Sequence, residues 1–240
     1  MAPKIEAVKR GRGRPAVFDR AVALKEAMKL FWERGYAGTS FDELIGVMGI
    51  SASSFYNSFG NKEQLYREAT EAYLQSSGGW FLGSLNDETI DTRTAFARLF
   101  AVVAREFTRN DLPLGCMISL ACTHVPPGLE SMRKMMAELR AGAEAAFAER
   151  IRKGIADGDV PKGTDVDALA SYYSALAQGL AVHARDGASR EKLLEIGRIG
   201  MLAWPTAPIK TNKSRGVGST TVLAGFGGRP TPDRPAKRKR

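Results

Sequence analysis

The chain has 240 residues, 44% of them hydrophobic, which is enough for one large domain or for a small domain joined to a larger one. No segment approaches the run of about 18 apolar residues that a membrane-spanning helix needs. The basic N-terminus lacks the apolar stretch of a secretory signal, so we expect a cytoplasmic protein. Two cysteines, Cys116 and Cys122, are too few for a disulfide framework.

The net charge of +9 is concentrated at the two ends of the chain. Residues 1–20 hold six Lys/Arg and two acids, and residues 205–240 hold nine Lys/Arg and one acid, which leaves 21–204 with a net charge of −3. Basic segments suit a polyanion such as DNA, because each phosphate contact releases condensed counterions. The alternative is that they only keep the protein in solution, which explains the C-terminal segment better than the N-terminal one.

Residues 1–17 are rich in Lys, Arg, Gly and Pro, and we expect a flexible arm there. Helical periodicity then begins, and Gly35 ends the first helix. Its apolar face is formed by Ala21, Leu24, Met28, Phe31 and Trp32.

Three further helices are predicted from their capping residues. Ser40 with Glu43 three residues later forms a capping box for a helix that ends at Gly49. Ser51 caps a third helix over 52–59, and Asn61 caps a fourth that runs from Lys62 to about Gln75. Two short helices joined by a three-residue turn with a glycine are typical of a helix-turn-helix.

The rest of the chain is predicted to be helical almost throughout, with no strand pattern and no internal repeat. The expected helices are 92–109, 117–123, 129–156, 164–185 and 189–203. After Trp204-Pro205 the apolar content is too low to stabilise an ordered segment. The predicted fold is therefore all-α. An arm (1–17) precedes a three-helix DNA-binding domain with a helix-turn-helix (18–65), then a larger helical domain (66–204) and a disordered basic tail (205–240).

The second helix of a helix-turn-helix lies in the major groove of DNA. Here that helix, 52–59, should turn Phe55 and Phe59 inward and leave small polar residues exposed, which can approach bases and phosphates closely. Some of these residues can also be read as simple helix caps or, for Tyr56, as a partly buried aromatic. The candidate DNA contacts are Ser40, Ser51, Ala52, Ser53, Ser54, Tyr56, Asn57 and Lys62.

The arm adds two more candidate contacts, Arg12 and Arg14. The run Arg12-Gly13-Arg14-Pro15 is similar to the core of an AT-hook, whose arginines enter narrow A·T-rich minor grooves. An arm beside a helix-turn-helix is well placed to reach the neighbouring groove.

The segment 39–65 resembles the N-terminal domain of the TetR family. The resemblance covers about residues 18–70 and rests on motifs in a fixed order: Gly35-Tyr36, the turn Gly49-Ile50-Ser51, the run Phe55-Tyr56-Asn57-Ser58-Phe59, and Lys62-Glu63-Gln64-Leu65. The chain departs from the family at Ser53, where Gly is usual, and at Ile45-Gly46 and Met48, where Ala is usual. The family implies an all-helical homodimer that represses transcription until a small-molecule effector releases it from its operator DNA, without a cofactor.

The family also implies that the last two helices form a four-helix dimer interface. The sequence is consistent with this, because apolar and small residues share faces of 164–185 and 189–203, although packing within one chain would give the same pattern. The candidate interface residues are Tyr172, Leu176, Gly179, Leu180, His183, Ile196 and Ile199.

An effector domain needs a cavity with apolar walls and a few polar groups. Aromatic residues and methionines supply the walls, although most such stripes are ordinary core. The candidate pocket residues are Phe100, Phe107, Cys116, Met117, Cys122, His124, Met136 and Tyr173. An effector bound there would change the spacing of the two heads of a dimer through the helix that starts at Lys62.

Cys116, Cys122 and His124 lie within nine residues of one another and have three interpretations. They could be small buried hydrophobes, a thiol sensor or part of a metal site, and the spacing matches no standard metal set. A cysteine nucleophile with a histidine base would make an enzyme, but no nucleophile elbow or phosphate-binding loop accompanies them, and we predict no enzyme. A third class is an architectural DNA-binding protein with a solid C-terminal core.

Overall fold

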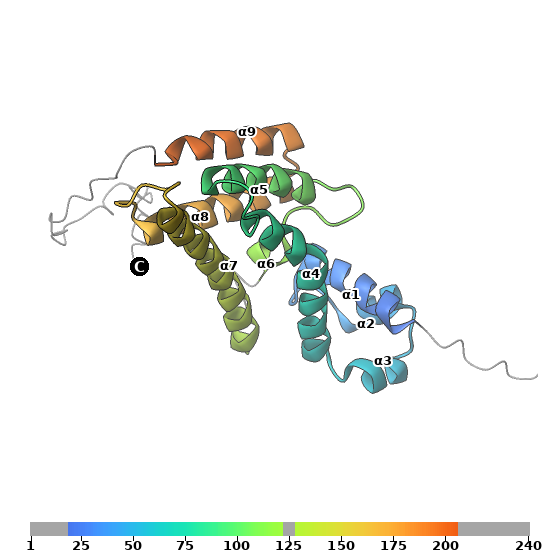
Figure 1. Ribbon diagram of the computed structural model, residues 1–240. Coiled ribbons are helices and arrows are strands. Elements are labelled where there is room, and N and C mark those ends of the chain that lie inside the picture. The colour runs from blue at the N-terminus through green and yellow to red at the C-terminus, as the bar shows by residue number, and fades with distance from the viewer. Residues whose placement is uncertain (1–18, 122–127, 206–240) are drawn as a thin grey trace, which may run out of the picture. The chain divides into compact units, whose positions relative to one another are not determined.

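The computed structural model in Figure 1 describes residues 19–121 and 128–205. This part of the chain contains α-helices and one short 3-10 helix but no strand, which confirms the all-α prediction. The elements are α1 (Arg20–Arg34), α2 (Phe41–Met48), α3 (Ala52–Phe59), α4 (Lys62–Leu85), α5 (Thr92–Phe107), α6 (Met117–Leu120), α7 (Glu130–Asp157), α8 (Val166–Arg185), α9 (Arg190–Gly200) and the 3-10 helix η1 (Met201–Ala203). No helix of the described residues is long and apolar enough to cross a membrane.

Side-chain caps fix the first turns of the three N-terminal helices that precede α4. The Asp19 carboxylate accepts hydrogen bonds from the backbone N–H groups of Ala21 and Val22 at the start of α1. At α2 the predicted capping box is present: the N–H of Glu43 donates to Ser40 Oγ, and the N–H of Ser40 donates to the Glu43 carboxylate. Gly49 ends α2 in the left-handed conformation (φ 65°), which a residue with a Cβ adopts only at a cost.

We expect Ser40→Ala to lower the free energy of unfolding by about 1 kcal/mol, because the substitution leaves an N–H at the start of α2 without its acceptor. Urea denaturation measures the change. Ser53→Ala removes an exposed hydroxyl from inside α3 and serves as the control with little expected effect. Equal losses in the two variants would mean that the box does not stabilise α2.

The first core joins α1–α4 to parts of the chain beyond residue 65. Its fully buried side chains include Phe31, Leu44, Phe55 and Tyr66 from the N-terminal helices. Met117 and Ile118 of α6 and Met132 and Met136 of α7 belong to the same cluster. Helices α1–α4, together with this first core, are called the head below. Its packing therefore continues across the predicted domain boundary between residues 65 and 66.

Helix α4 continues to Leu85, ten residues past the predicted end near Gln75. The residues that follow Gln75, Ser76-Ser77-Gly78-Gly79, have low helix propensity. The helix continues through them because the residues that follow are anchored: Leu85 is fully buried, and Trp80 and Phe81 pack against the second core.

The second core lies among α5, α7, α8 and α9, and Figure 1 shows α5, α8 and α9 above the N-terminal helices with α7 running down beside α4. Phe96, Phe147 and Tyr173 form its aromatic centre, with ring centroids 5.0–5.3 Å apart. Gly197 lets α9 approach α5 closely, because a Cβ at this position would lie 3.0 Å from the Cβ of Phe100. These four helices therefore form the rigid support of the C-terminal half.

Three predicted helices end earlier than the periodicity indicated, and one of them, predicted over 92–109, ends at Phe107. The helix predicted over 117–123 stops at Leu120, because Ala121 has an extended backbone (ψ 142°). The last predicted helix divides into α9 and η1 at Gly200. The predicted arm and tail lie outside the described residues.

Candidate nucleic-acid interface and effector cavity

Helices α2 and α3 are joined by the three-residue turn that the sequence predicts. Gly49 closes α2, and the Ser51 hydroxyl accepts from the N–H of Ser54, 3.2 Å away, to open α3. Phe55 and Phe59 of α3 are buried against the head. The two helices thus form a helix-turn-helix with one face of α3 turned outward.

The outward face of α3 carries the residues predicted to contact DNA. Ala52, Ser53 and Asn57 are exposed, and the Tyr56 side chain is 56% exposed. The Tyr56 ring stacks on Phe41 of α2 with centroids 5.4 Å apart, which holds its hydroxyl at the surface. Ser40 and Ser51 are also exposed and serve as helix caps, whereas Ser54 is half-buried.

Lys62 is more enclosed than a simple phosphate ligand would be. Its ammonium donates to the backbone oxygen of Thr39 and lies 4.4 Å from the ring centroid of Tyr36. This partial burial lowers the pKa of Lys62, an effect that the nearby Glu43 opposes. Lys62 therefore connects the start of α4 to the segment before α2. Its ammonium keeps further N–H groups that can donate to a phosphate.

Sequence reasoning missed Arg20, which anchors the far end of α3. Its guanidinium donates to the backbone oxygen of Ser58 at 3.1 Å, pairs with Glu68 at 2.6 Å and lies 4.5 Å from the ring centroid of Phe59. Arg20 thus connects α1, α3 and α4. An arginine at the first turn of a helix gives no sequence signal for such a role. Arg12 and Arg14 lie outside the described residues.

A cavity of about 510 Å³ opens between α4, α5, α6, α7 and α8. Its walls are mainly apolar, and the aromatic side chains among them come from α4, α5 and α7. The described residues that line it are Tyr73, Leu74, Gln75, Trp80, Phe81, Leu82, Val103, Phe107, Cys116, Ile118, Ser119, Leu139, Arg140, Gly142, Ala143, Ala146, Phe147, Ser174, Ala177 and Gln178. Its size and composition are typical of a site for a small organic molecule.

Two of the predicted pocket residues, Phe107 and Cys116, line this cavity. The prediction fails for four others, which do not line it because they fill the cores: Phe100, Met117, Met136 and Tyr173. Cys122 and His124 lie outside the described residues. Periodicity identifies apolar faces but does not separate a packed face from one beside a void, which explains the failure.

Polar groups of the cavity are linked to the head through Tyr73. Its hydroxyl donates to Cys116 Sγ at 3.3 Å, and its ring packs edge-on against Trp32 of α1, with centroids 4.9 Å apart. Burial, followed by the proximity of Cys116, raises the pKa of the Tyr73 hydroxyl. On the opposite wall, the Gln178 amide donates to Ser174 Oγ at 3.1 Å. Sequence reasoning missed these residues because single polar residues in a helix look like part of a solvated face.

Cys116 is half-buried between the cavity and the head. It caps α6 by accepting a weak hydrogen bond from the N–H of Ser119, 3.5 Å away. Among the described residues, no group of three His, Cys, Asp or Glu side chains lies close enough together to hold a metal ion. Cys116 therefore combines a structural role in α6 with access to the cavity.

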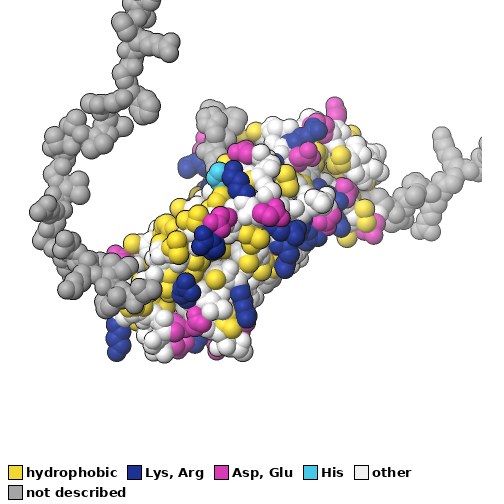
Figure 2. Space-filling view, turned by 90° about the horizontal axis from the view of Figure 1, so that it is seen from above, with side chains coloured by type: hydrophobic (Ala, Val, Ile, Leu, Met, Phe, Trp, Pro, Cys, Tyr) yellow, Lys and Arg dark blue, Asp and Glu magenta, His cyan; other side chains and the backbone are white. Residues whose placement is uncertain are grey.

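The outer side of α8 and α9 exposes several apolar side chains, and Figure 2 shows hydrophobic side chains among charged ones on the side of the molecule seen from above. Tyr172, Gly179, His183 and Ile199 are exposed there. Val182, Leu194 and Leu202 are further exposed apolar residues of this part of the chain. Leu180 is a correction, since it is fully buried within the protomer, and Leu176 and Ile196 are half-buried against the second core.

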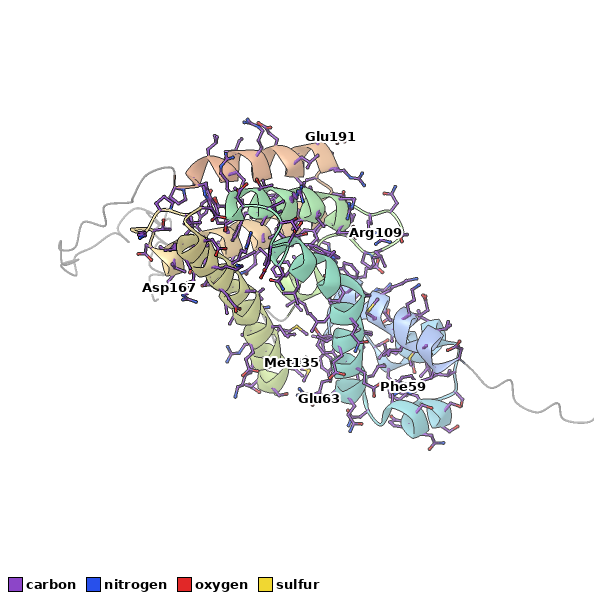
Figure 3. All side chains as sticks on the ribbon, in the orientation of Figure 1. Phe59, Glu63, Arg109, Met135, Asp167 and Glu191 are labelled. Carbon is purple, nitrogen blue, oxygen red and sulfur yellow. The ribbon has the colours of Figure 1, made fainter. Side chains whose placement is uncertain are left out.

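Besides the shared core, hydrogen bonds join the N-terminal helices to the rest of the chain on two sides. Arg185 at the end of α8 donates to the backbone oxygens of Trp32, Glu33 and Leu114 at 2.7–3.1 Å. On the other side, Figure 3 shows Glu63 of α4 and Met135 of α7 facing the same space. There Ser131 donates to Glu63 at 3.3 Å, and Arg67 contacts the sulfur of Met135 at 3.5 Å.

Comparison with known proteins gives a consistent result over most of the chain. Residues 23–69 match the family model "Bacterial regulatory proteins, tetR family", and residues 95–194 match "Tetracyclin repressor-like, C-terminal domain". The chain is 36% identical over 200 residues to the HTH-type transcriptional repressor ComR of Escherichia coli K12, covering 83% of this chain and 95% of that protein.

Among solved structures, a cysteine mutant of the TetR family regulator CifR, complexed with a 26-base-pair double-strand operator DNA, is 38% identical with a TM-score of 0.77. The match covers 80% of this chain and 100% of CifR. The reduced form of NemR from E. coli has a TM-score of 0.67 at 20% identity, covers 78% of this chain and 98% of its own, and shows the shared fold.

Proposed function

This chain belongs to the TetR family of bacterial regulatory proteins, and from that premise we propose that it is a transcriptional repressor that a small-molecule effector releases from its operator. The observation that carries the proposal is the pairing of an exposed α3 face with a cavity that shares α6 with the head. The DNA-bound state of CifR and the repressor name of ComR support it. A protein that acts on bacterial chromosomal DNA works in the cytoplasm, where we place this one.

The outward face of α3 is suited to reading bases. Asn57 can bond an adenine through two hydrogen bonds, and the serines can bond bases or phosphates. Because Phe55 and Phe59 fix the rotation of α3 against the head, the face cannot turn away from the DNA. Lys62, Ser40 and the arm residues Arg12 and Arg14 are proposed as phosphate and minor-groove contacts.

We propose a homodimer that forms through the outer face of α8 and α9. Apolar side chains as exposed as Ile199 and Leu202 are unfavourable in water and gain stability when a second copy covers them. A two-fold dimer presents two α3 helices to successive major grooves, which are roughly 34–36 Å apart.

Release of the DNA would follow because the cavity and the head share residues. Ile118 lines the cavity and packs in the head core, and Tyr73 lines it and packs on Trp32 of α1. The dimer that binds DNA and the dimer that binds the ligand would differ in the spacing of their heads. The ligand weakens DNA binding by the difference between its binding free energies for these two dimers.

The test is a binding titration with the DNA beside the protein's own gene and an unrelated fragment, at two salt concentrations. We expect tight, fragment-selective binding by the wild type. Asn57→Ala is expected to weaken selective binding about tenfold or more, since one good base contact contributes about 1–3 kcal/mol. Tyr56→Phe keeps the stack on Phe41 but removes a hydroxyl that can reach a phosphate, and it is expected to weaken binding to both fragments.

Ser171→Ala on α8 is the matched control, because its hydroxyl is exposed and bonds only to Glu144. Weak, salt-sensitive binding that is equal on both fragments and unaffected by the α3 variants would favour the architectural alternative, in which only the basic ends hold DNA.

A further inference from the structure

Arg140 of α7 is the one charged side chain on the wall of the effector cavity. The other lining residues that the structure describes are apolar or neutral polar, and they include no aspartate or glutamate. The cavity therefore presents a positive charge among aromatic and aliphatic walls. Such a wall disfavours a cationic ligand and favours an anionic one.

Among the described residues, only part of the donor capacity of Arg140 is used. Its Nη1 donates to the backbone oxygens of Ile118 and Ala121 at 2.9 and 3.0 Å. Its Nε and Nη2 have no acceptor, and no carboxylate pairs with it, among the described residues. Arg67 and Arg152, on α4 and α7, each have an acidic partner. Arg140 is half-buried at the cavity wall, so its attraction for an anion would be only partly screened by water.

We propose that the effector is a small organic acid, whose carboxylate binds to Nε and Nη2 of Arg140 and whose apolar body fills the space between the aromatic walls. The planar guanidinium edge matches the two oxygens of a carboxylate. Trp80, Phe107 and Phe147 offer surfaces for an aromatic or aliphatic body. The inference rests on the proposed function, because it treats this cavity as the effector site.

The position of Arg140 also links such a ligand to the head. The two oxygens that Nη1 holds belong to the end of α6, and the side chains of Ile118 and Ala121 pack in the head core. An anion on the same guanidinium would shift or redistribute these hydrogen bonds. Occupation of the charged end of the cavity would therefore act directly on the element that cavity and head share.

The experiment uses 2-naphthoate and 2-naphthamide, which share one apolar body and differ in charge at neutral pH. Calorimetric titration of the full-length protein measures their dissociation constants. We expect the wild type to bind 2-naphthoate at least about tenfold more tightly, because a hydrogen-bonded ion pair in a partly buried site is stronger than neutral hydrogen bonds. A preference for the amide, or no binding of the acid, would overturn the proposal.

Three variants locate the preference. Arg140→Gln removes the charge and is expected to abolish the preference, while Arg140→Lys keeps the charge and is expected to retain part of it even though the hydrogen bonds to α6 change. Arg133→Gln removes an exposed charge from the same helix and is expected to leave the preference unchanged. An undiminished preference in Arg140→Gln would overturn the proposal.

Operator binding, measured in parallel, separates this inference from the proposed function. An Arg140-dependent preference for the acid with unchanged operator affinity would support the acid site and contradict its role as the effector site. Binding and operator release by 2-naphthamide, with the acid inactive, would support the effector cavity and overturn the acid.

Discussion

Replacing Ile199 and Leu202 with aspartate is expected to convert the proposed dimer to a monomer and to weaken operator binding by about 10²- to 10⁴-fold, the gain that two linked binding modules have over one. Ile199 on α9 is 52% exposed, and Leu202 on η1 is 71% exposed. Their replacement therefore leaves the protomer core intact. In a two-fold interface, however, each substitution occurs twice and places carboxylates in an apolar contact.

Sedimentation equilibrium measures the assembly state, and titration with the operator measures the affinity. Val22→Asp on α1 introduces the same kind of charge at an apolar side chain that is 57% exposed, and it should leave the dimer intact. A double variant that stays dimeric would show that another surface holds the two copies together. A monomer with full operator affinity would show that the two heads bind independently.

The short helices of the head could be predicted from sequence because their signals are local. Ser40, Glu43 and Ser51 act within three residues of one another, and the same hydrogen bonds are present in the structure. The four-residue spacing of Phe55 and Phe59 likewise needs no information from the rest of the chain. A short motif is sufficient to predict a helix when its capping residue and its apolar face lie close together in the sequence.

The cavity could not be predicted at the same level because a void depends on how distant helices meet. Phe100 and Phe107 are seven residues apart on one face of α5, yet only Phe107 reaches the cavity. Close packing of α9 at Gly197 places Phe100 in the second core. The same limit explains Leu180, which shares an apolar helix with exposed Gly179 but faces the protomer interior.

The structural roles of several arginines could not be predicted from the sequence either, because a charged residue in a helix is usually solvated. Arg140, Arg150 and Arg185 each donate to backbone oxygens that come from other parts of the chain. Such oxygens lie at helix ends or in connections, where the backbone lacks its own partners. The location of these ends in space is a property of the fold and not of the local sequence.

Arg185 has the largest set of such bonds, and Arg185→Gln is expected to lower the free energy of unfolding by about 2 kcal/mol, because the oxygens of Trp32, Glu33 and Leu114 lose a charged donor. The same loss should weaken operator binding about tenfold, the equivalent of about 1.4 kcal/mol. Arg185 touches no part of the outward α3 face. Its effect on DNA would come from the freedom that the head gains when α1 is no longer attached to the end of α8.

Urea denaturation and operator titration of the same preparation give both values. Arg152→Gln is the control, since it removes an arginine of α7 that pairs with Asp167 in an exposed ion pair, which contributes little to stability. A stability loss without any change in operator affinity would mean that these bonds hold the fold together but do not position the head. A loss of both in Arg185→Gln, and of neither in Arg152→Gln, would identify the end of α8 as the support on which the DNA-binding geometry depends.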